Sequence, residues 1–274
     1  MLIEIKDVYK IYGEGLESEV RALDGVSLSI DRGEFVAVVG QSGSGKSTMM
    51  NVLGCLDIPT HGEYYLDGTN VRELSDRELS RIRNRQIGFI FQQYNLIQSL
   101  TVLENVELPL IYQGVGADER RELAMEALER VGLLGRIKHK PVEMSGGQQQ
   151  RVAIARTLAP EPSVLFMDEP LSNLDAKLRL EMRYELQRLH LETGSTFVYV
   201  THDQMEAMTL ATQICLIENG VLQQYDAPLT VYNRPNNLFV ADFVGNPSIN
   251  FVEAKGAQRA DGAVELTVFQ GRKA

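Results

Sequence analysis

A buried strand that runs into a glycine-rich loop and then a helix constrains this chain more than any other feature. Residues 34–39 form a nearly continuous apolar run, which predicts a strand inside a parallel sheet. Residues 40–47 follow it and fit the pattern G-x-x-x-x-G-K-[ST], and residues 46–53 then predict a helix. Glycines let backbone N–H groups converge on phosphate oxygens, and the helix N-terminus adds the positive end of its dipole. We therefore expect a nucleoside triphosphate site on an α/β fold.

The side chains of this loop have specific expected roles. Lys46 is expected to reach the β- and γ-phosphates, and the Ser47 hydroxyl is expected to ligate Mg²⁺. The alternative is a flexible Gly/Ser loop without a ligand, and the flanking strand and helix argue against it. The residues of this segment that we expect to bind the nucleotide are Gly40, Ser42, Gly43, Ser44, Gly45, Lys46, Ser47 and Thr48.

A second apolar run, residues 164–168, ends in two acids, Asp168 and Glu169. Ligands gather at the carboxyl ends of parallel strands, so Asp168 is placed to reach the Mg²⁺ ion. Glu169 is placed to orient or activate a water molecule against the γ-phosphate. Alone, these acids would fit an ordinary strand end with solvated carboxylates. Together with the phosphate loop they predict a site that hydrolyses a nucleoside triphosphate.

Strands that alternate with helices predict a mainly parallel, doubly wound sheet flanked by helices, which is the core of a P-loop NTPase. The further buried runs are residues 196–200 and 214–217. Short apolar runs within residues 2–5 and 26–30 flank a polar loop and predict an antiparallel β-subdomain at the N-terminus.

Residues 95–145 show a different pattern from the rest of the chain. Their apolar residues recur at helical spacing, as at Leu123, Ala127, Leu128 and Val131, so we expect an α-helical subdomain inserted between the second and third core strands. Near the C-terminus, alternating apolar residues after an Ala-Asp-Gly turn predict a short strand pair that is too small for a core of its own.

Composition limits the class of protein further. The 274 residues contain 37 Asp and Glu against 27 Lys and Arg, and this net charge of −10 argues against a nucleic-acid partner. Cys55 and Cys215 provide neither a disulfide framework nor metal-ligand spacing, so we expect them to be packing residues. The N-terminus lacks a signal-peptide pattern, and no stretch approaches the ~20 apolar residues of a membrane span. We therefore expect a cytoplasmic protein that meets the membrane only through a partner.

The motif Met-Ser-Gly-Gly-Gln at residues 144–148 is more specific than the phosphate loop. With it, the chain resembles the nucleotide-binding subunits of ABC transporters over residues 1 to about 253. That family usually has Leu in place of Met144, and both side chains are apolar and unbranched at Cβ. The resemblance implies an ATP-dependent homodimer that works with transmembrane permease subunits on the inner face of the cell membrane. It also implies that one subunit covers the ATP of the other with Ser145, Gly146, Gly147 and Gln148.

Other roles follow from the same resemblance. Tyr12 resembles the aromatic residue that stacks on adenine, with Tyr9 as an alternative. Gln92 resembles the glutamine that contacts Mg²⁺ and the attacking water, with Gln93 as an alternative. Asp175 lies in a loop that is similar to one that crosses the dimer interface, where position 173 is more commonly Ala than Asn.

His202 resembles the switch histidine that hydrogen-bonds the γ-phosphate. The expected catalytic residues are therefore Glu169, His202, Gln92 and Lys46, and the expected metal ligands are Ser47, Gln92 and Asp168.

The resemblance differs between the two halves of the chain. Residues 10–141 look like the lipoprotein-release and macrolide-efflux class, whereas residues 163–253 look like the maltose-type sugar importers. Export and import therefore stay open, and the chain is a natural mosaic, a truncation or an engineered chimera. We expect an ATPase domain over residues 1–240. Residues 241–274 are then an extension that begins the regulatory β-domain of the importers.

Two other classes of function fit this sequence less well than a transporter subunit. A soluble ABC ATPase of DNA repair would need a long coiled-coil insertion, and one of translation would need two cassettes. A small-molecule kinase that shares only the phosphate loop would need neither the motif at residues 144–148 nor His202.

Overall fold

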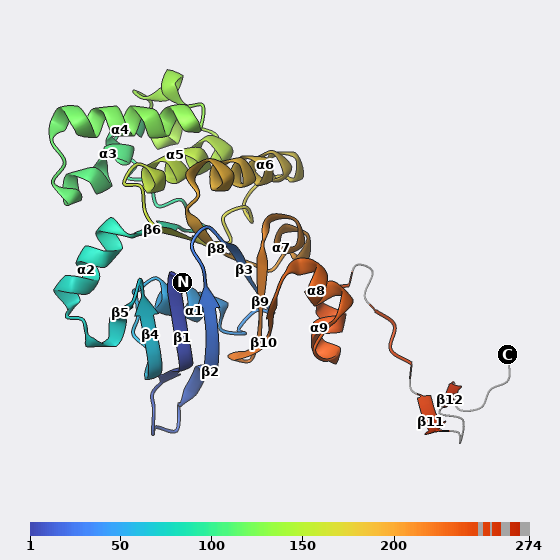
Figure 1. Ribbon diagram of the computed structural model, residues 1–274. Coiled ribbons are helices and arrows are strands. Elements are labelled where there is room, and N and C mark those ends of the chain that lie inside the picture. Colours follow the sequence, from blue (N-terminus) through green and yellow to red (C-terminus); the bar gives the residue numbers. More distant parts are fainter. Residues whose placement is uncertain (246–248, 253, 259–263, 269–274) are drawn as a thin grey trace.

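A six-stranded sheet forms the centre of the structure and confirms the expected α/β core (Figure 1). The computed structural model describes residues 1–245, 249–252, 254–258 and 264–268. The strand order is β10-β9-β3-β8-β7-β6, and the pairs from β9 to β6 are parallel, whereas β10 runs antiparallel to β9. The strands of this sheet are β3 (Phe35–Val39), β6 (Ile87–Ile90), β7 (Val164–Asp168), β8 (Thr196–Thr201), β9 (Gln213–Glu218) and β10 (Val221–Asp226).

A second, antiparallel sheet forms the expected N-terminal β-subdomain, in the order β2-β1-β4-β5. Alternate residues of its first two strands are buried because one face of the sheet packs on the core. Two of its strands, β4 and β5, were not predicted. Its strands are β1 (Ile3–Tyr12), β2 (Val20–Ile30), β4 (His61–Leu66) and β5 (Thr69–Asn70).

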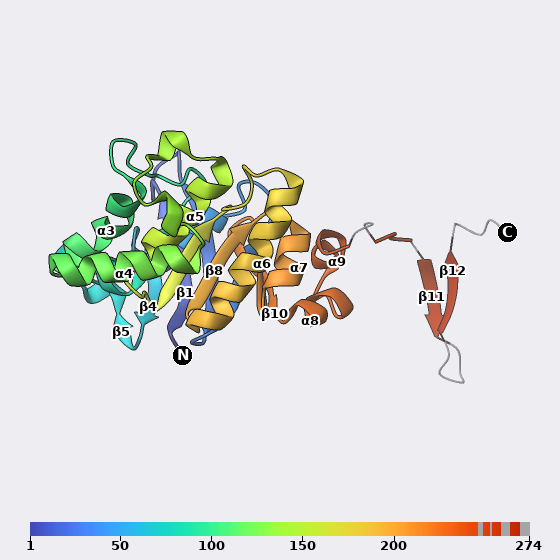
Figure 2. The same ribbon diagram turned by 90° about the horizontal axis from the view of Figure 1, so that it is seen from above.

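The two faces of the central sheet pack against different partners (Figures 1 and 2). Val36 and Val38 belong to the apolar cluster that also contains the buried residues of the antiparallel sheet and of α1 (Lys46–Leu53). Phe35 belongs to the cluster that is shared with the helices of the opposite face. These are α3 (Val102–Gln113), α4 (Ala117–Arg130), α5 (Gly146–Leu158) and α6 (Ala176–Thr193).

The expected helical subdomain is present, and it lies between β6 and β7, the second and third strands of the central sheet in chain order. Its first long helix begins with a capping box, in which Thr101 and Glu104 exchange hydrogen bonds. The predicted apolar face is buried at Ala127, Leu128 and Val131. The remaining helices between β5 and β7 are η1 (Val71–Glu73), α2 (Asp76–Arg85), η2 (Leu134–Arg136) and η3 (Pro141–Glu143).

The C-terminal part of the chain contains short helices and one strand pair. Val231 and Val240 bury their side chains with Val39 of the central sheet, so the core extends beyond the last strand of that sheet. Strands β11 (Ala254–Gln258) and β12 (Val264–Val268) pair antiparallel, which confirms the predicted strand pair, and the predicted Ala-Asp-Gly turn lies outside the described residues. The helices are α7 (Gln204–Leu210), α8 (Pro228–Asn233) and α9 (Leu238–Phe243).

Candidate nucleotide-binding site

The phosphate loop joins β3 to α1, and close contacts with the backbone require its glycines. A Cβ atom at Gly40 would lie 2.2 Å from the carbonyl oxygen of Ile217, and one at Gly45 would lie 2.4 Å from that of Ala22. Gly45 also has φ of 104°, in a region that favours glycine. The loop is therefore fixed against neighbouring strands, with its curvature set by residues that have no side chain.

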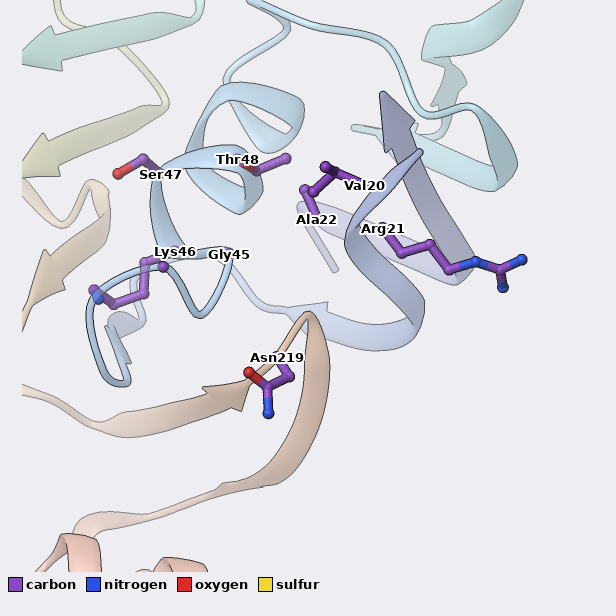
Figure 3. A pocket seen from close by; sticks show the side chains of 9 residues that line it. Val20, Arg21, Ala22, Gly45, Lys46, Ser47, Thr48 and Asn219 are labelled. Atoms are coloured by element: carbon purple, nitrogen blue, oxygen red, sulfur yellow. The ribbon is translucent and has the colours of Figure 1, made fainter. Parts of the chain in front are cut away.

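A pocket of about 330 Å³ opens beside this loop (Figure 3). One wall comes from Val20, Arg21 and Ala22 at the start of β2, and another comes from Asn219 in the turn between β9 and β10. The floor is the loop itself and the first turn of α1. In Figure 3 the Arg21 side chain points away from the loop, so the wall at this position is its backbone. The remaining lining residues are Gly43, Gly45, Lys46, Ser47 and Thr48.

The turn between β9 and β10 braces the phosphate loop. The Gly220 N–H donates to the carbonyl of Ser44 at 2.9 Å, and the Gly220 carbonyl accepts from the N–H of Asp24 at the same distance. This contact and the pocket walls were not predicted from the sequence, because both bring together segments that are far apart in the chain. The Asn219–Gly220 pair was nevertheless an available signal, since Asn-Gly is the preferred sequence of a tight hairpin turn.

Lys46 is the first residue of α1, and its side chain is buried. Its ammonium group donates to the carbonyls of Gly40 at 3.0 Å and Gln41 at 2.8 Å. Burial lowers the pKa of Lys46, and the carboxylates of Glu169 and Asp168 oppose that shift. The loop therefore holds a desolvated cation close to two acids, an arrangement that suits binding of phosphates together with a metal ion.

The two acids occupy the carboxyl end of β7, as predicted. Burial raises the pKa of Asp168, helped by the charge of Glu169 and opposed by Lys46. Glu169 has φ of 43°, which is a strained conformation for a residue with a side chain, and its N–H donates to the Val200 carbonyl at 3.0 Å. Such strain concentrates at functional sites, where the surrounding structure holds it.

His202 follows β8 and reaches the acid at the end of the adjacent strand. Its Nδ1 atom lies 3.1 Å from Oε1 of Glu169, and the imidazole is otherwise largely exposed. The structure therefore brings together Lys46, Asp168, Glu169 and His202 from three segments of the chain, as the sequence led us to expect.

Gln92 is linked to the loop that follows Glu169. Its side-chain Nε2 atom donates to Oγ of Ser172 at 3.1 Å, and its backbone carbonyl accepts from Nδ2 of Asn173 at 3.0 Å. The Ser172 hydroxyl in turn donates to the carbonyl of Glu169 at 2.9 Å. These contacts involve Gln92 rather than its neighbour Gln93, and they connect the segment before the helical subdomain with Glu169.

Tyr12 lies beside the first turn of α1. Its hydroxyl donates to Asp57 at 3.1 Å, and Lys10 lies over its ring at 5.0 Å. Burial raises the pKa of Tyr12, and a hydrogen bond with the Thr48 side chain acts in the opposite direction. Tyr9, the alternative, instead contacts His61 edge-on. Tyr12 is thus the tyrosine that adjoins a residue lining the pocket.

The motif at residues 144–148 opens α5. Ser145 caps this helix, and its backbone and side chain exchange hydrogen bonds with Gln148. Ser145 and Gly146 are exposed, whereas Met144 is buried in the large apolar cluster. None of the residues from Ser145 to Gln148 lines the pocket at the phosphate loop. Within one chain, these two helix N-termini therefore do not share that pocket.

Asp175 and Gly147 have roles inside the chain that the sequence did not reveal. The carboxylate of Asp175 caps α6 by accepting from the N–H of Leu178 at 3.0 Å. Gly147 is buried, and a Cβ atom there would lie 2.5 Å from the Leu178 side chain. The side chain of Leu178 therefore occupies the space into which a side chain at position 147 would extend.

Two features of the site fit a nucleotide and a divalent cation. Ser44 has a buried hydroxyl oxygen without a hydrogen-bond partner among the described residues, and it lies inside the phosphate loop. The expected metal ligands, Ser47, Gln92 and Asp168, offer hydroxyl, amide and carboxylate oxygens, which suit a hard cation. The fold and this site define a P-loop NTPase.

Comparison with known proteins gives the family. The family described as ABC transporter matches residues 23–172. An ABC transporter ATP-binding protein of Thermotoga maritima is 49% identical over 231 residues, which is 84% of this chain and 97% of that protein. A solved structure of the ATP-binding cassette MJ0796, a dimer bound to ADP and Pi, superimposes with a TM-score of 0.74. Its sequence identity is 45%, and the match covers 83% of this chain and 99% of that one.

The chain therefore belongs to the ABC transporter family, as one of its ATP-binding, ATP-hydrolysing members. Its relatives include proteins named for export and proteins named for import. The macrolide export protein MacB of Hyphomonas neptunium is 53% identical over 80% of this chain and 34% of its own length. The xylose/arabinose import protein XacK of Haloferax volcanii is 43% identical over 98% of this chain and 67% of its own length. In the described part of the chain, the helices are too short or too polar to cross a membrane.

Proposed function

We propose that this chain powers transport by hydrolysing ATP at a site in which Lys46, Glu169 and His202 act together. The observation that carries the proposal is the convergence of these groups at the ends of β3, β7 and β8, with His202 3.1 Å from Glu169. Lys46 binds the β- and γ-phosphates, and Glu169 orients and activates the attacking water. His202 hydrogen-bonds the γ-phosphate while Glu169 limits the orientations of its ring.

The proposed metal site uses Ser47, Gln92 and Asp168. A bound Mg²⁺ would neutralise charge on the phosphate oxygens. Ser47 is exposed at the first turn of α1, and Asp168 is the last residue of β7, so both face the end of the sheet where the phosphates would lie. Gln92 would contact the metal ion and the attacking water, and its hydrogen bond to Ser172 connects it to the loop that contains Asp175.

The proposed active form is a homodimer with ATP at its interface. The exposed start of α5, with Ser145 and Gly146, lies outside the phosphate-loop pocket of its own chain. A second subunit would bring this helix end, with its N–H groups and hydroxyl, to the γ-phosphate. Tyr12 would stack on the adenine at the opposite end of the nucleotide. The relative MJ0796 was solved as a dimer with ADP and Pi, which supports this arrangement.

The proposed permease partner would dock on the groove between α2, β6 and α3. This groove encloses about 250 Å³ and is lined by Ile87, Phe89 and Pro109 with Arg83 and Arg156 at its edge. Tyr112 is 73% exposed at the same place. An exposed aromatic side chain beside half-buried arginines is a combination that fits a protein interface, where both residue types are enriched. Docking there would hold the chain on the inner face of the cell membrane.

The domain division and the transport direction are part of the same proposal. Residues 1–240 would form the ATPase unit, and residues 241–274 would form an extension of the sugar-importer type. The match to XacK spans 98% of this chain, which supports such an extension, whereas the match to MacB spans 80%. The permease that the chain serves decides between import and export.

Reconstitution in sealed liposomes tests the proposal. The chain is added with its permease, and ATP is supplied on the side that carries the chain. We expect ATP-dependent substrate movement that is lost in Glu169→Gln, and the compartment in which the substrate accumulates gives the direction. ATP turnover that is the same with and without the permease and its substrate would contradict a transport role.

A further inference from the structure

Glu206 is a buried acid directly behind the candidate catalytic histidine. It lies in the first turn of α7 and is 4% exposed. Its Oε2 atom accepts two hydrogen bonds, from the Tyr199 hydroxyl at 2.8 Å and from the Thr201 hydroxyl at 2.7 Å. Burial raises the pKa of Tyr199 well above its ordinary value, so this hydroxyl stays protonated and remains a donor. The function proposed above gives this acid no role.

Thr201 connects Glu206 to the backbone on either side of His202. While its hydroxyl donates to Glu206, the same oxygen accepts from the N–H of Asp203 at 3.0 Å. The hydrogen bond from Asp203 to the Thr201 side chain thereby closes a small ring of atoms that includes the backbone of His202. A hydroxyl rotates freely unless a strong acceptor fixes its proton, so Glu206 determines which lone pair of Thr201 faces Asp203.

Asp203 completes the frame around the histidine. Its carboxylate caps α7 by accepting from the N–H groups of Met205 and Glu206, at 2.8 and 3.1 Å. Its other carboxylate oxygen lies 3.9 Å from the guanidinium of Arg179. His202 itself has an exposed ring, so its position depends on the backbone that carries it.

We propose that Glu206 is a positioning residue for His202, acting through the Thr201 hydroxyl. The inference rests on the role proposed above for His202 in ATP hydrolysis. A carboxylate suits the task because it accepts both hydroxyl donors and donates nothing in return. Loss of this acceptor frees the Thr201 hydroxyl, and a displacement of about 1 Å in a catalytic group is enough to cost about 100-fold in rate.

The chain offers a matched pair of variants for the test. Thr201→Val and Tyr199→Phe each remove one hydroxyl that donates to the same oxygen of Glu206, and both side chains are buried. Only Thr201 also bonds to the backbone next to His202. We expect Thr201→Val to lower kcat for ATP about tenfold or more while KM stays within about twofold, and Tyr199→Phe to keep both within about twofold.

Changes at Glu206 itself provide the second arm. Glu206→Gln keeps an acceptor oxygen and is expected to retain kcat within about threefold, whereas Glu206→Met removes the acceptor and is expected to match Thr201→Val. Thermal unfolding of each variant is measured alongside turnover. An equal fall in kcat for Thr201→Val and Tyr199→Phe would overturn the proposal, because that pattern indicates general loss of packing.

A double variant separates this inference from the proposed function. If Thr201 acts through His202, adding Thr201→Val to His202→Ala lowers kcat by no more than about twofold beyond His202→Ala alone. A further tenfold fall in the double variant would show that Thr201 acts by another route and would overturn the inference. Wild-type turnover in His202→Ala would contradict the role of His202 itself, and the inference with it.

Discussion

The Nδ1 atom of His202 lies 3.1 Å from Oε1 of Glu169, across the ends of two neighbouring parallel strands. The contact joins the two groups that act on the γ-phosphate and on the attacking water in the proposed mechanism. Because each residue stands at the carboxyl end of its strand, the register of β7 against β8 sets their separation. The geometry that the proposed mechanism needs is therefore set by the central sheet.

Replacement of Glu169 by Gln tests the proposed base. The amide keeps the shape of the side chain and loses the group that accepts a proton, so ATP is still bound. We expect turnover to fall by about 10²–10⁴-fold with little change in ATP affinity. Steady-state ATPase assays and nucleotide titration measure the two quantities separately. Hydrolysis at the wild-type rate would rule out Glu169 as the base.

Replacement of Lys46 by Ala should act mainly on binding. It removes charge-assisted hydrogen bonds to the phosphates, which contribute roughly 1.5–3 kcal/mol each, so we expect ATP to bind about ten- to a hundredfold more weakly. Calorimetric titration gives the affinity. Lys138→Ala, at an exposed lysine outside the pocket, is the control and should bind ATP normally. Equal affinities for the two variants would contradict the role of Lys46.

The raised pKa of Asp168 predicts a cost in stability at neutral pH. Its folded-state pKa lies above the unfolded value near 3.8, so folding disfavours its ionised form. Below the unfolded pKa the Asp168 carboxyl is protonated in both the folded and the unfolded protein, so it does not lower the free energy of unfolding. The loss of stability develops as the pH rises from there through the folded-state pKa. Asp168→Asn should therefore unfold at a higher Tm than wild type at pH 7, without nucleotide or magnesium.

The gap in Tm between Asp168→Asn and wild type should shrink as the pH falls toward about 4. Differential scanning calorimetry across this range checks both the sign and the trend. A variant that is less stable at pH 7, or a gap that does not change with pH, would show that burial does not disfavour the Asp168 carboxylate.

The two cysteines should be unreactive in the native protein. Burial raises the pKa of Cys55 to about 11 and that of Cys215 to about 12, and both thiols lie in the apolar core. Since the thiolate is the nucleophile, we expect negligible labelling by a chromogenic disulfide reagent at pH 8, and two thiols per chain after denaturation. Rapid labelling of either thiol in the native state would contradict its burial.

The parts of the fold that were predicted from the sequence rest on contiguous patterns. The phosphate loop, α1 and the buried strands each follow from a short run of residues whose period or composition is distinctive. Strand β10 was missed because only Gln224 is buried in it, so it lacks an apolar pattern. Strand β6 has four residues, and Gly88 interrupts its apolar run.

The site was predictable to the same degree and for the same reason. The residues expected at strand ends, Asp168, Glu169 and His202, come together because parallel strands share one edge. Contacts that depend on tertiary packing were not predictable, such as the Gly220 brace on the phosphate loop and the fit of Leu178 against Gly147. The catalytic, nucleotide-binding and metal-binding roles expected for the site residues stay predictions.

The choice of variant for a dimerisation test follows from the geometry of the start of α5. A side chain at Gly147 would collide with Leu178 inside the same chain, so Gly147→Asp would disturb folding as well as any interface. Gly146 is exposed, and a Cβ atom there would meet only the Tyr94 hydroxyl, at 3.7 Å. Gly146→Asp therefore places a negative charge at the helix end without an internal clash.

Light scattering on Glu169→Gln most directly tests the central claim, that ATP completes the interface between two copies of this chain. The γ-phosphate would reach the second helix end, where charge-assisted hydrogen bonds of roughly 1.5–3 kcal/mol each act at two symmetric sites. We predict a dimer with ATP and Mg²⁺, a monomer with ADP, and a monomer with ATP when Gly146→Asp is added. An ATP sample that stays monomeric at tens of micromolar, or a Gly146→Asp double variant that still dimerises, would contradict the account.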